Sequence, residues 1–191
     1  MMHQDRVRYH LEKMLSEGLG FNLQDPNLID TPARIAKMYC KEWFKGNDSE
    51  FVDFKSFPNT KEYKQIITFD KIHFSSVCSH HFLPFTGLAW LLYIPKDKLV
   101  GASKPARLIE HYASRPQLQE NLTHEVINQF VEHIQPLGAM VVMRASHECM
   151  VCRGAKQTNG AGMITDALSG CFFEPDVKAE GLELVKLSLM I

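Results

Sequence analysis

Residues 78–85 read CSHHFLPF and place one thiol and two imidazoles between two segments that favour β-structure. Residues 65–74 on one side and 86–94 on the other are rich in β-branched and aromatic side chains, a composition typical of strands. The quoted stretch is therefore predicted to connect two strands. Its cysteine and its histidines would then lie at a strand-to-strand connection.

Helices are predicted on both sides of this strand pair in the sequence. Apolar residues recur at helical spacing over residues 4–17, and this helix is expected to stop at Gly18. Thr31 offers a hydroxyl cap just before Pro32, which predicts a second helix that ends near Gly46. A polar segment that reads as a loop and two further helices follow, over residues 47–64, 103–113 and 118–136.

The last third of the chain is predicted to return to β-structure. Residues 140–152 read as a strand, a glycine-rich turn (NGAG, Asn159 to Gly162) follows, and a final strand is expected over residues 169–174. A mixture of this kind indicates an α+β fold. We expect an N-terminal helical extension over residues 1–64 and a main domain over residues 65–191.

The charge balance and the cysteines narrow the class of protein. The 191 residues include 21 lysines and arginines against 22 aspartates and glutamates, so no basic field favours nonspecific nucleic-acid binding. The N-terminal sequence lacks the apolar core of a signal peptide, and the longest apolar stretch, residues 88–94, is too short to span a bilayer. Five scattered cysteines argue for reduced thiols, which can bind metal. We therefore expect a cytoplasmic protein with no nucleic-acid and no membrane partner.

Two short segments carry the residue types of a metal site. Cys78 and His81 are three residues apart, a spacing that a tight turn brings together around one ion, whereas the adjacent His80 must point elsewhere. His147 and Cys149 lie two apart on a predicted strand, so the alternation of a strand puts both on one face. Thiolates combined with imidazole favour zinc over magnesium or calcium.

Three interpretations of these residues compete. In the first they are buried thiols and a hydrogen-bonded core histidine, an interpretation that two separate cysteine–histidine clusters argue against. In the second, all four residues, Cys78, His81, His147 and Cys149, close a structural zinc site. In the third, Cys78, His81 and Cys149 bind zinc and water takes the fourth position. His80 and His147 are then free for proton transfer, and these spare imidazoles favour the third interpretation.

Several motifs resemble those of one enzyme family. DTPARIAKMY, CSHHFLPFTG, GASKPAR, QLQENLT and SHECMVCRG occur in the order and approximate spacing that mark GTP cyclohydrolase I. The chain is similar to that family from about residue 21 to residue 185. The resemblance implies a zinc enzyme of the tunnelling fold, an antiparallel sheet with helices packed on one face, here preceded by the helical extension.

The family resemblance also implies an activity and an assembly. GTP would be hydrolysed to 7,8-dihydroneopterin triphosphate and formate, a first step that folate, tetrahydrobiopterin and deazaguanine routes share. Active sites would lie at subunit interfaces of a homodecamer built from two pentameric rings. An open position on the zinc ion would lower the pKa of bound water toward about 7, for attack on purine C8. His147 is the best-placed acid for purine N7, and His80 would be the second proton carrier.

The resemblance assigns substrate contacts as well. Gln119 and Glu120 match the pair that holds guanine, and a carboxylate suits the adjacent N1–H and N2–H2 donors of that base. Without the resemblance, both would read as solvated residues that open a helix. The triphosphate would lie at the helix predicted to start at residue 103, where unpaired N–H groups favour an anion. The expected triphosphate-binding residues are Ser103, Lys104, Arg107 and Arg153, the last of which comes from a neighbouring subunit in the family.

Two departures from the family pattern keep a second hypothesis open. Ser79 replaces the acidic residue that is usual after the first cysteine, and residues 155–170 match the family's continuation only loosely, although Thr165 is retained. The alternative is a purine- or pterin-binding protein of the same fold, in which the zinc ion is structural and the chemistry is altered or lost.

Overall fold

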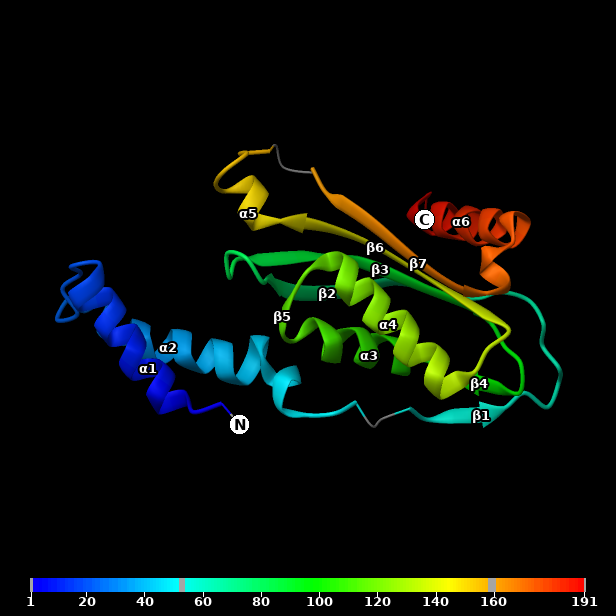
Figure 1. Ribbon diagram of the computed structural model, residues 1–191, viewed down its shortest axis with the longest axis horizontal. Helices are drawn as coiled ribbons and strands as arrows, with labels where there is room; N and C mark the ends of the chain where they lie inside the picture. The colour runs from blue at the N-terminus through cyan, green and yellow to red at the C-terminus, as the bar shows by residue number, and fades with distance from the viewer. Residues whose placement is uncertain (1, 52–53, 158–160, 191) are drawn as a thin grey trace. The chain divides into compact units, whose positions relative to one another are not determined.

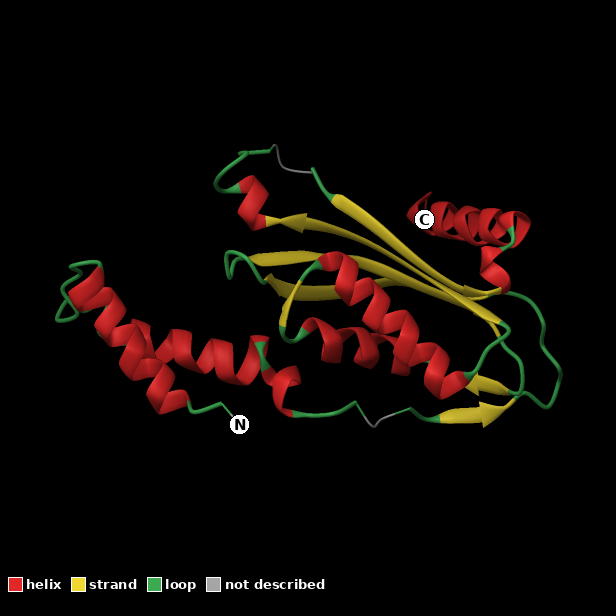
Figure 2. Cartoon of the chain, viewed as in Figure 1, coloured by secondary structure: helices red, strands yellow, loops and turns green. Residues whose placement is uncertain are grey.

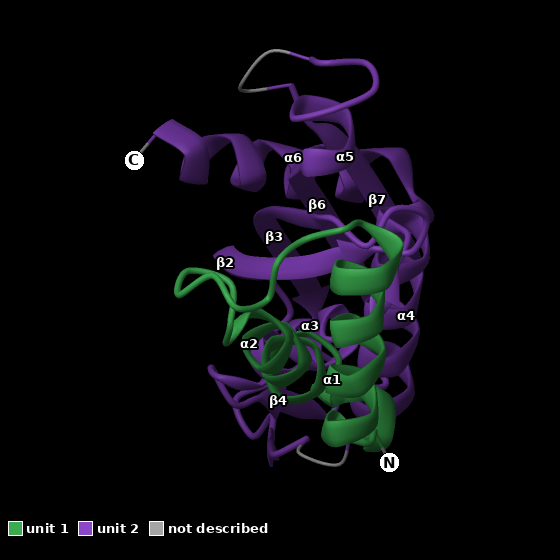
Figure 3. Ribbon diagram, turned by 90° about the vertical axis from the view of Figure 1, so that its left-hand side faces the viewer, with its two compact units in different colours: residues 1–50 green, residues 51–191 purple. Residues whose placement is uncertain are grey.

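The computed structural model describes residues 2–51, 54–157 and 161–190, and the chain divides into two compact units, residues 1–50 and 51–191 (Figure 3). In the first unit, α1 (Gln4–Lys13) continues into a π-helical turn that ends at Gly18, as predicted. The second predicted helix is also present as α2 (Thr31–Met38), followed by a π-helical turn, η2 (Tyr39–Trp43), and a 3-10 turn, η3 (Lys45–Asp48). The expected hydroxyl cap is wrong, because the cap position is Asp30, and Thr31 is already the first helical residue.

The second unit is built on a five-stranded sheet of order β5-β2-β3-β6-β7 (Figures 1 and 2). Neighbouring strands are antiparallel, except that β5 runs parallel to β2. The strand pair predicted around residues 78–85 is therefore confirmed. The strands are β2 (Ile67–Cys78), β3 (Pro84–Ile94), β5 (Pro116–Gln117), β6 (Gly138–His147) and β7 (Met163–Gly170).

Helices cover both faces of this sheet (Figure 1). The predicted pair, α3 (Lys104–Ala113) and α4 (Gln119–Ile134), packs on one face against residues such as Leu91, which is completely buried. On the other face, α6 (Pro175–Met190) packs against Trp90, whose indole N–H donates to Ser188 Oγ at 2.8 Å. Successive residues of β3 thus supply two cores, because strand side chains alternate between faces. The α+β class is confirmed, with α6 as a helical layer that the sequence did not predict.

The predicted segmentation of residues 140–174 is wrong in two places. β6 ends at His147 and a short helix, α5 (Glu148–Val151), follows, so residues 140–152 are not one strand. β3, the partner strand of β6, begins at Pro84. Proline has no N–H to extend the β3–β6 ladder beyond the pair of Phe85 and His147. The final strand expected at 169–174 is also wrong, because a 3-10 turn over Cys171–Phe173 leads from β7 into α6. The glycine-rich turn expected at Asn159 to Gly162 lies partly outside the described residues.

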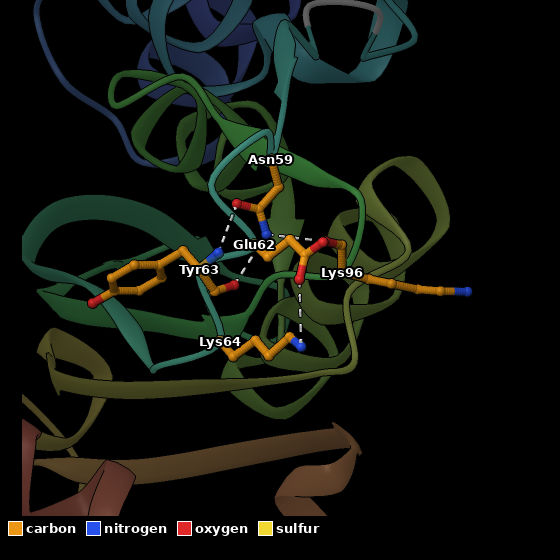
Figure 4. A network of polar contacts seen from close by, with 5 residues as sticks. All are labelled: Asn59, Glu62, Tyr63, Lys64 and Lys96. Carbon is orange, nitrogen blue, oxygen red and sulfur yellow. Dashed lines mark hydrogen bonds and ion pairs between the residues drawn. The ribbon is translucent and has the colours of Figure 1, made fainter.

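The segment expected to be a loop, residues 47–64, contains β1 (Ser56–Pro58), which pairs with β4 (Lys98–Val100). Asn59 closes the turn that follows: its Oδ1 accepts from Tyr63 N–H, and its Nδ2 donates to the carbonyl oxygens of Tyr63 and Lys96, each at 3.0 Å (Figure 4). These contacts make residues 51–64 part of the second compact unit. The functional division of the chain at residues 64 and 65 stays a prediction.

Candidate metal centre and active site

Three side chains gather at one end of the sheet. Cys78 is the last residue of β2, and a tight turn returns the chain to β3, with Cys78 N–H donating to Leu83 O and Phe82 N–H to Cys78 O, both at 2.9 Å. His81 lies within this turn, and Cys149 approaches from α5. The Sγ atoms of Cys78 and Cys149 are 3.9 Å apart, and the three potential ligand atoms all lie within 4.8 Å of one another.

Strand register explains why residues so distant in sequence meet. Pro84 pairs with Val77 and Phe85 pairs with His147. The end of β2, the start of β3 and the end of β6 therefore lie at the same end of the sheet (Figure 1). β5 lies at the same end of the sheet, since Ser79 N–H donates to the carbonyl oxygen of Gln117 at 3.0 Å. The turn that carries His81 is therefore held by backbone hydrogen bonds from both of its flanks.

The donor set fits a zinc ion. Two thiols and an imidazole are the soft and borderline ligands that zinc prefers, and three protein ligands with an open fourth position are typical of catalytic zinc sites. Burial raises the pKa of the Cys149 thiol, the thiol of Cys78 raises it further, and the guanidinium of Arg153 opposes both. Because a bound cation compensates the charge of adjacent thiolates, a pair of thiols placed this closely suits a metal.

His147 does not belong to this group of ligands within the described residues. The expectation that His147 and Cys149 share one face of a strand is wrong, because the strand ends between them. The imidazole of His147 stacks on the ring of Phe85, with centroids 4.5 Å apart and planes 4° apart, and its Nε2 lies 2.8 Å from Oε1 of Gln119. The four-ligand interpretation therefore gains no support from the geometry.

Gln119 and Glu120, expected as a pair, lie in opposite environments. Gln119 is completely buried, and its Nε2 donates to Met143 O at 3.2 Å and to Met163 O and Thr165 Oγ1 at 3.1 Å. Glu120 is exposed and acts on the same histidine: burial lowers the pKa of His147, and the carboxylate of Glu120 opposes that change. The interpretation of both as solvated residues is wrong for Gln119.

Sequence reasoning missed the supporting role of two threonines. Thr165 Oγ1 lies 2.7 Å from Thr123 Oγ1, and Thr123 Oγ1 donates to the backbone carbonyl oxygen of Gln119 at 2.7 Å. Thr123 follows Gln119 by one helical turn, a spacing that could have indicated a side-chain bond to the backbone. Thr165 could not be linked to Gln119 from the sequence, because the contact depends on how β7 lies against α4.

The remaining expected residues divide into two places. His80 is exposed in the same turn as His81, with ring centroids 6.3 Å apart, and Arg153 is exposed just after α5. The other three residues expected to hold the triphosphate, Ser103, Lys104 and Arg107, lie instead at the start of α3, whose other end leads into β5 beside Cys78. A ten-residue helix is about 15 Å long. Ser103 and Arg107 are exposed there, and Lys104 is buried.

Comparison with known proteins identifies the family. The family model described as GTP cyclohydrolase I matches residues 7–186. The chain belongs to the GTP cyclohydrolase I family. GTP cyclohydrolase 1 of Geobacillus kaustophilus is 39% identical over 179 residues, which cover 91% of this chain and 93% of the relative. GTP cyclohydrolase 1 of Thermoanaerobacter pseudethanolicus is 37% identical over 187 residues, covering 97% and 98%.

Membership of the GTP cyclohydrolase I family makes this chain an enzyme of the tunnelling fold. The matched range includes residues 155–170, so the loosely matching segment lies inside the family region, and the alternative of a binding protein is not favoured. Among solved structures, the apo archaeosine synthase QueF-Like aligns with a TM-score of 0.45 and 16% identity, over 55% of this chain and 93% of that chain. No helix in the described part of the chain is long and apolar enough to cross a membrane.

Proposed function

We propose that this member of the GTP cyclohydrolase I family hydrolyses GTP at C8 of the guanine ring, releasing formate and giving 7,8-dihydroneopterin triphosphate. The observation that carries the proposal is the group of three potential metal ligands, Cys78, His81 and Cys149, at the same end of the sheet as His147. A family match over residues 7–186 supplies the substrate class.

The metal ligands are Cys78, His81 and Cys149. A zinc ion bound there supplies Lewis-acid chemistry, which activates water for attack on an electrophilic carbon at neutral pH. His147 is assigned to purine N7, because protonation of N7 makes C8 electrophilic, and His80 is assigned as the second proton carrier. Glu120 is assigned to bind guanine, since its exposed carboxylate can accept hydrogen bonds from the adjacent N1–H and N2–H2 donors of that ring.

Ser103, Lys104, Arg107 and Arg153 are assigned to the triphosphate. Ser103 is the residue before α3, and its hydroxyl makes no capping bond to that helix. The positive end of the helix dipole and two nearby cations, Lys104 and Arg107, favour an anion with several charges. The separation of this helix start from the metal group, about one helix length of 15 Å, supports a site that more than one subunit completes. A homodecamer of two pentameric rings and a cytoplasmic location complete the proposal.

The test is to incubate the zinc-loaded protein with GTP and to measure formate and the fluorescent oxidised pterin. Cys149→Ser is expected to lose zinc and product formation. Cys152→Ser is the matched control in the same short segment: the Cys152 thiol is exposed, donates to Glu148 O at 2.9 Å, and lies outside the ligand group. That variant is expected to keep both zinc and activity.

The proton-carrier roles are tested in the same assay. His147→Ala and His80→Ala are each expected to lower formate release by about 100-fold or more, the usual contribution of a general acid or base. Full formate release by both variants would show that the two roles are wrong. A fully metallated wild-type protein that forms no product would refute the proposed activity itself.

A further inference from the structure

The side chain of Gln119 has both of its polar atoms engaged inside the subunit. Its nitrogen lies near the carbonyl oxygens of Met143 and Met163, and its oxygen lies 2.8 Å from Nε2 of His147. Backbone carbonyl oxygens can only accept hydrogen bonds, so the amide nitrogen must face them and the amide oxygen must face the histidine. Because an amide oxygen can only accept, Nε2 of His147 must carry the proton.

Two threonines fix the same orientation from the other side. Thr123 Oγ1 uses its only proton on the carbonyl oxygen of Gln119, at 2.7 Å. The contact between Thr165 Oγ1 and Thr123 Oγ1, also 2.7 Å, must therefore use the Thr165 proton. Thr165 Oγ1 then has lone pairs left, and it accepts from Gln119 Nε2 at 3.1 Å. The direction of each side-chain hydrogen bond from Thr123 to His147 is thus determined.

Two contacts restrict the imidazole of His147: ring stacking and the hydrogen bond at Nε2. It lies parallel to the ring of Phe85, the residue opposite it in the β3–β6 ladder. With Nε2 engaged by a completely buried amide, Nδ1 is the nitrogen of His147 left for a substrate. A ring that could turn over would offer either nitrogen, and the stacking together with the hydrogen bond opposes such a turn.

We propose that Gln119 is a positioning residue for His147 rather than a contact to guanine, and that Thr165, ordered by Thr123, holds Gln119 in the required orientation. Nδ1 of His147 is then the atom that faces the substrate, and in the acid role it donates from the doubly protonated ring, in which Nε2–H still donates to Gln119 Oε1. The inference rests on the proposed function for the identity of the substrate, and it deepens the role given there to His147. It separates Gln119 from its neighbour Glu120, which keeps the contact to the base.

Kinetics test this assignment. Gln119→Met keeps the length of the side chain and removes both hydrogen-bonding atoms, so kcat for formate release should fall by about 10- to 100-fold, as when a residue that orients a metal-bound histidine is removed. The KM for GTP should stay within about twofold, because no substrate contact is lost. Glu120→Gln should show the opposite split, with a raised KM.

The threonine supplies a second, milder test. Thr165→Val should lower kcat in the same direction, and Thr165→Ser, which restores a hydroxyl, should recover most of it. Thr68→Val is the matched control: this threonine lies on β2 of the same sheet, and its buried hydroxyl makes no hydrogen bond within the described residues. Its kinetics should equal those of the wild type.

A readout that needs no activity separates this inference from the proposed function. Solid-state NMR of protein labelled with 13C and 15N in histidine reports which nitrogen of each neutral imidazole carries the proton, and a His147→Asn sample identifies the signal. The wild type should show His147 protonated at Nε2, and Gln119→Met should lose that preference. Protonation at Nδ1 in the wild type, or a Gln119→Met variant that raises KM at unchanged kcat, would overturn the proposal. Wild-type protein without product would refute the activity and leave the NMR result decisive for Gln119.

Discussion

At the scale of single residues, Gln119 and Glu120 show how far a motif can be read. Both stand in the first turn of α4, where consecutive side chains point about 100° apart, so the two neighbours enter different surroundings. One is completely buried beside His147, and the other is exposed. The sequence predicted both as substrate contacts, and the helix places them in opposite environments.

A buried hydroxyl without a partner gives a prediction at the same scale. Thr68 Oγ1 is buried and makes no hydrogen bond within the described residues. Thr68→Val should raise the free energy of unfolding by about 1 kcal/mol, because the unsatisfied hydroxyl is replaced by a methyl group of similar shape. Urea unfolding at a fixed protein concentration measures the change. Thr123→Val, which removes a bonded hydroxyl, should lower the same quantity, and a loss of stability in Thr68→Val would show that its hydroxyl has a partner in the assembly.

At the scale of elements, the ends of strands decide the site. The strands on either side of residues 78–85 were predictable because their composition is local information. The end of β6 was not, because its last residue, His147, pairs with Phe85 in a partner strand far away in the sequence. That end turns Cys149 into α5, toward Cys78, and leaves His147 on the sheet beside Phe85. The change from strand to helix after His147 therefore separates this histidine from the metal ligand Cys149.

The link between β7 and α6 gives the prediction for this scale. Gly170 has φ +58° and ψ −132°, and a Cβ atom there would lie 2.2 Å from the carbonyl oxygen of Leu137. Gly170→Ala should lower the free energy of unfolding by about 1–3 kcal/mol, since an L side chain is strained in this backbone conformation. Gly18→Ala is the control, because nothing lies within 4 Å of the added atom. Equal stability of the two variants in urea unfolding would contradict the argument.

At the scale of the whole molecule, the proposed triphosphate residues at the start of α3 lie one helix length from the metal ligands, whereas Arg153 acts on the thiol of Cys149 in its own subunit. The resemblance assigns Arg153 to a neighbouring subunit, and a shared site has a direct test. Arg153→Ala and Cys149→Ser should each be inactive. In oligomers mixed from equal amounts of both, about one quarter of the sites should combine Cys149 of an Arg153→Ala subunit with Arg153 of a neighbouring Cys149→Ser subunit, and these sites should be active. Activity and zinc content of the mixed sample measure this.

The mixing experiment has its own control. Cys78→Ser mixed with Cys149→Ser should stay inactive, because both ligands belong to the metal group of one subunit. Light scattering should give about 218 kDa for each mixture, ten times the 21.8 kDa of the chain. Mixed decamers of Arg153→Ala and Cys149→Ser that remain inactive would place Arg153 in the site of its own subunit.

The sequence by itself determined the kind of chemistry: the thiol and imidazole of Cys78 and His81 at the spacing of one turn, a strand on each side of that turn, and a further thiol in a later segment. These are local properties, set by residue type and by the periods of strand and turn. Only the tertiary structure decided which residue of the pair His147 and Cys149 joins the metal group, and that Gln119 is buried against His147. Those outcomes depend on the register of strands and on the packing of α4 against β7, which no local pattern encodes.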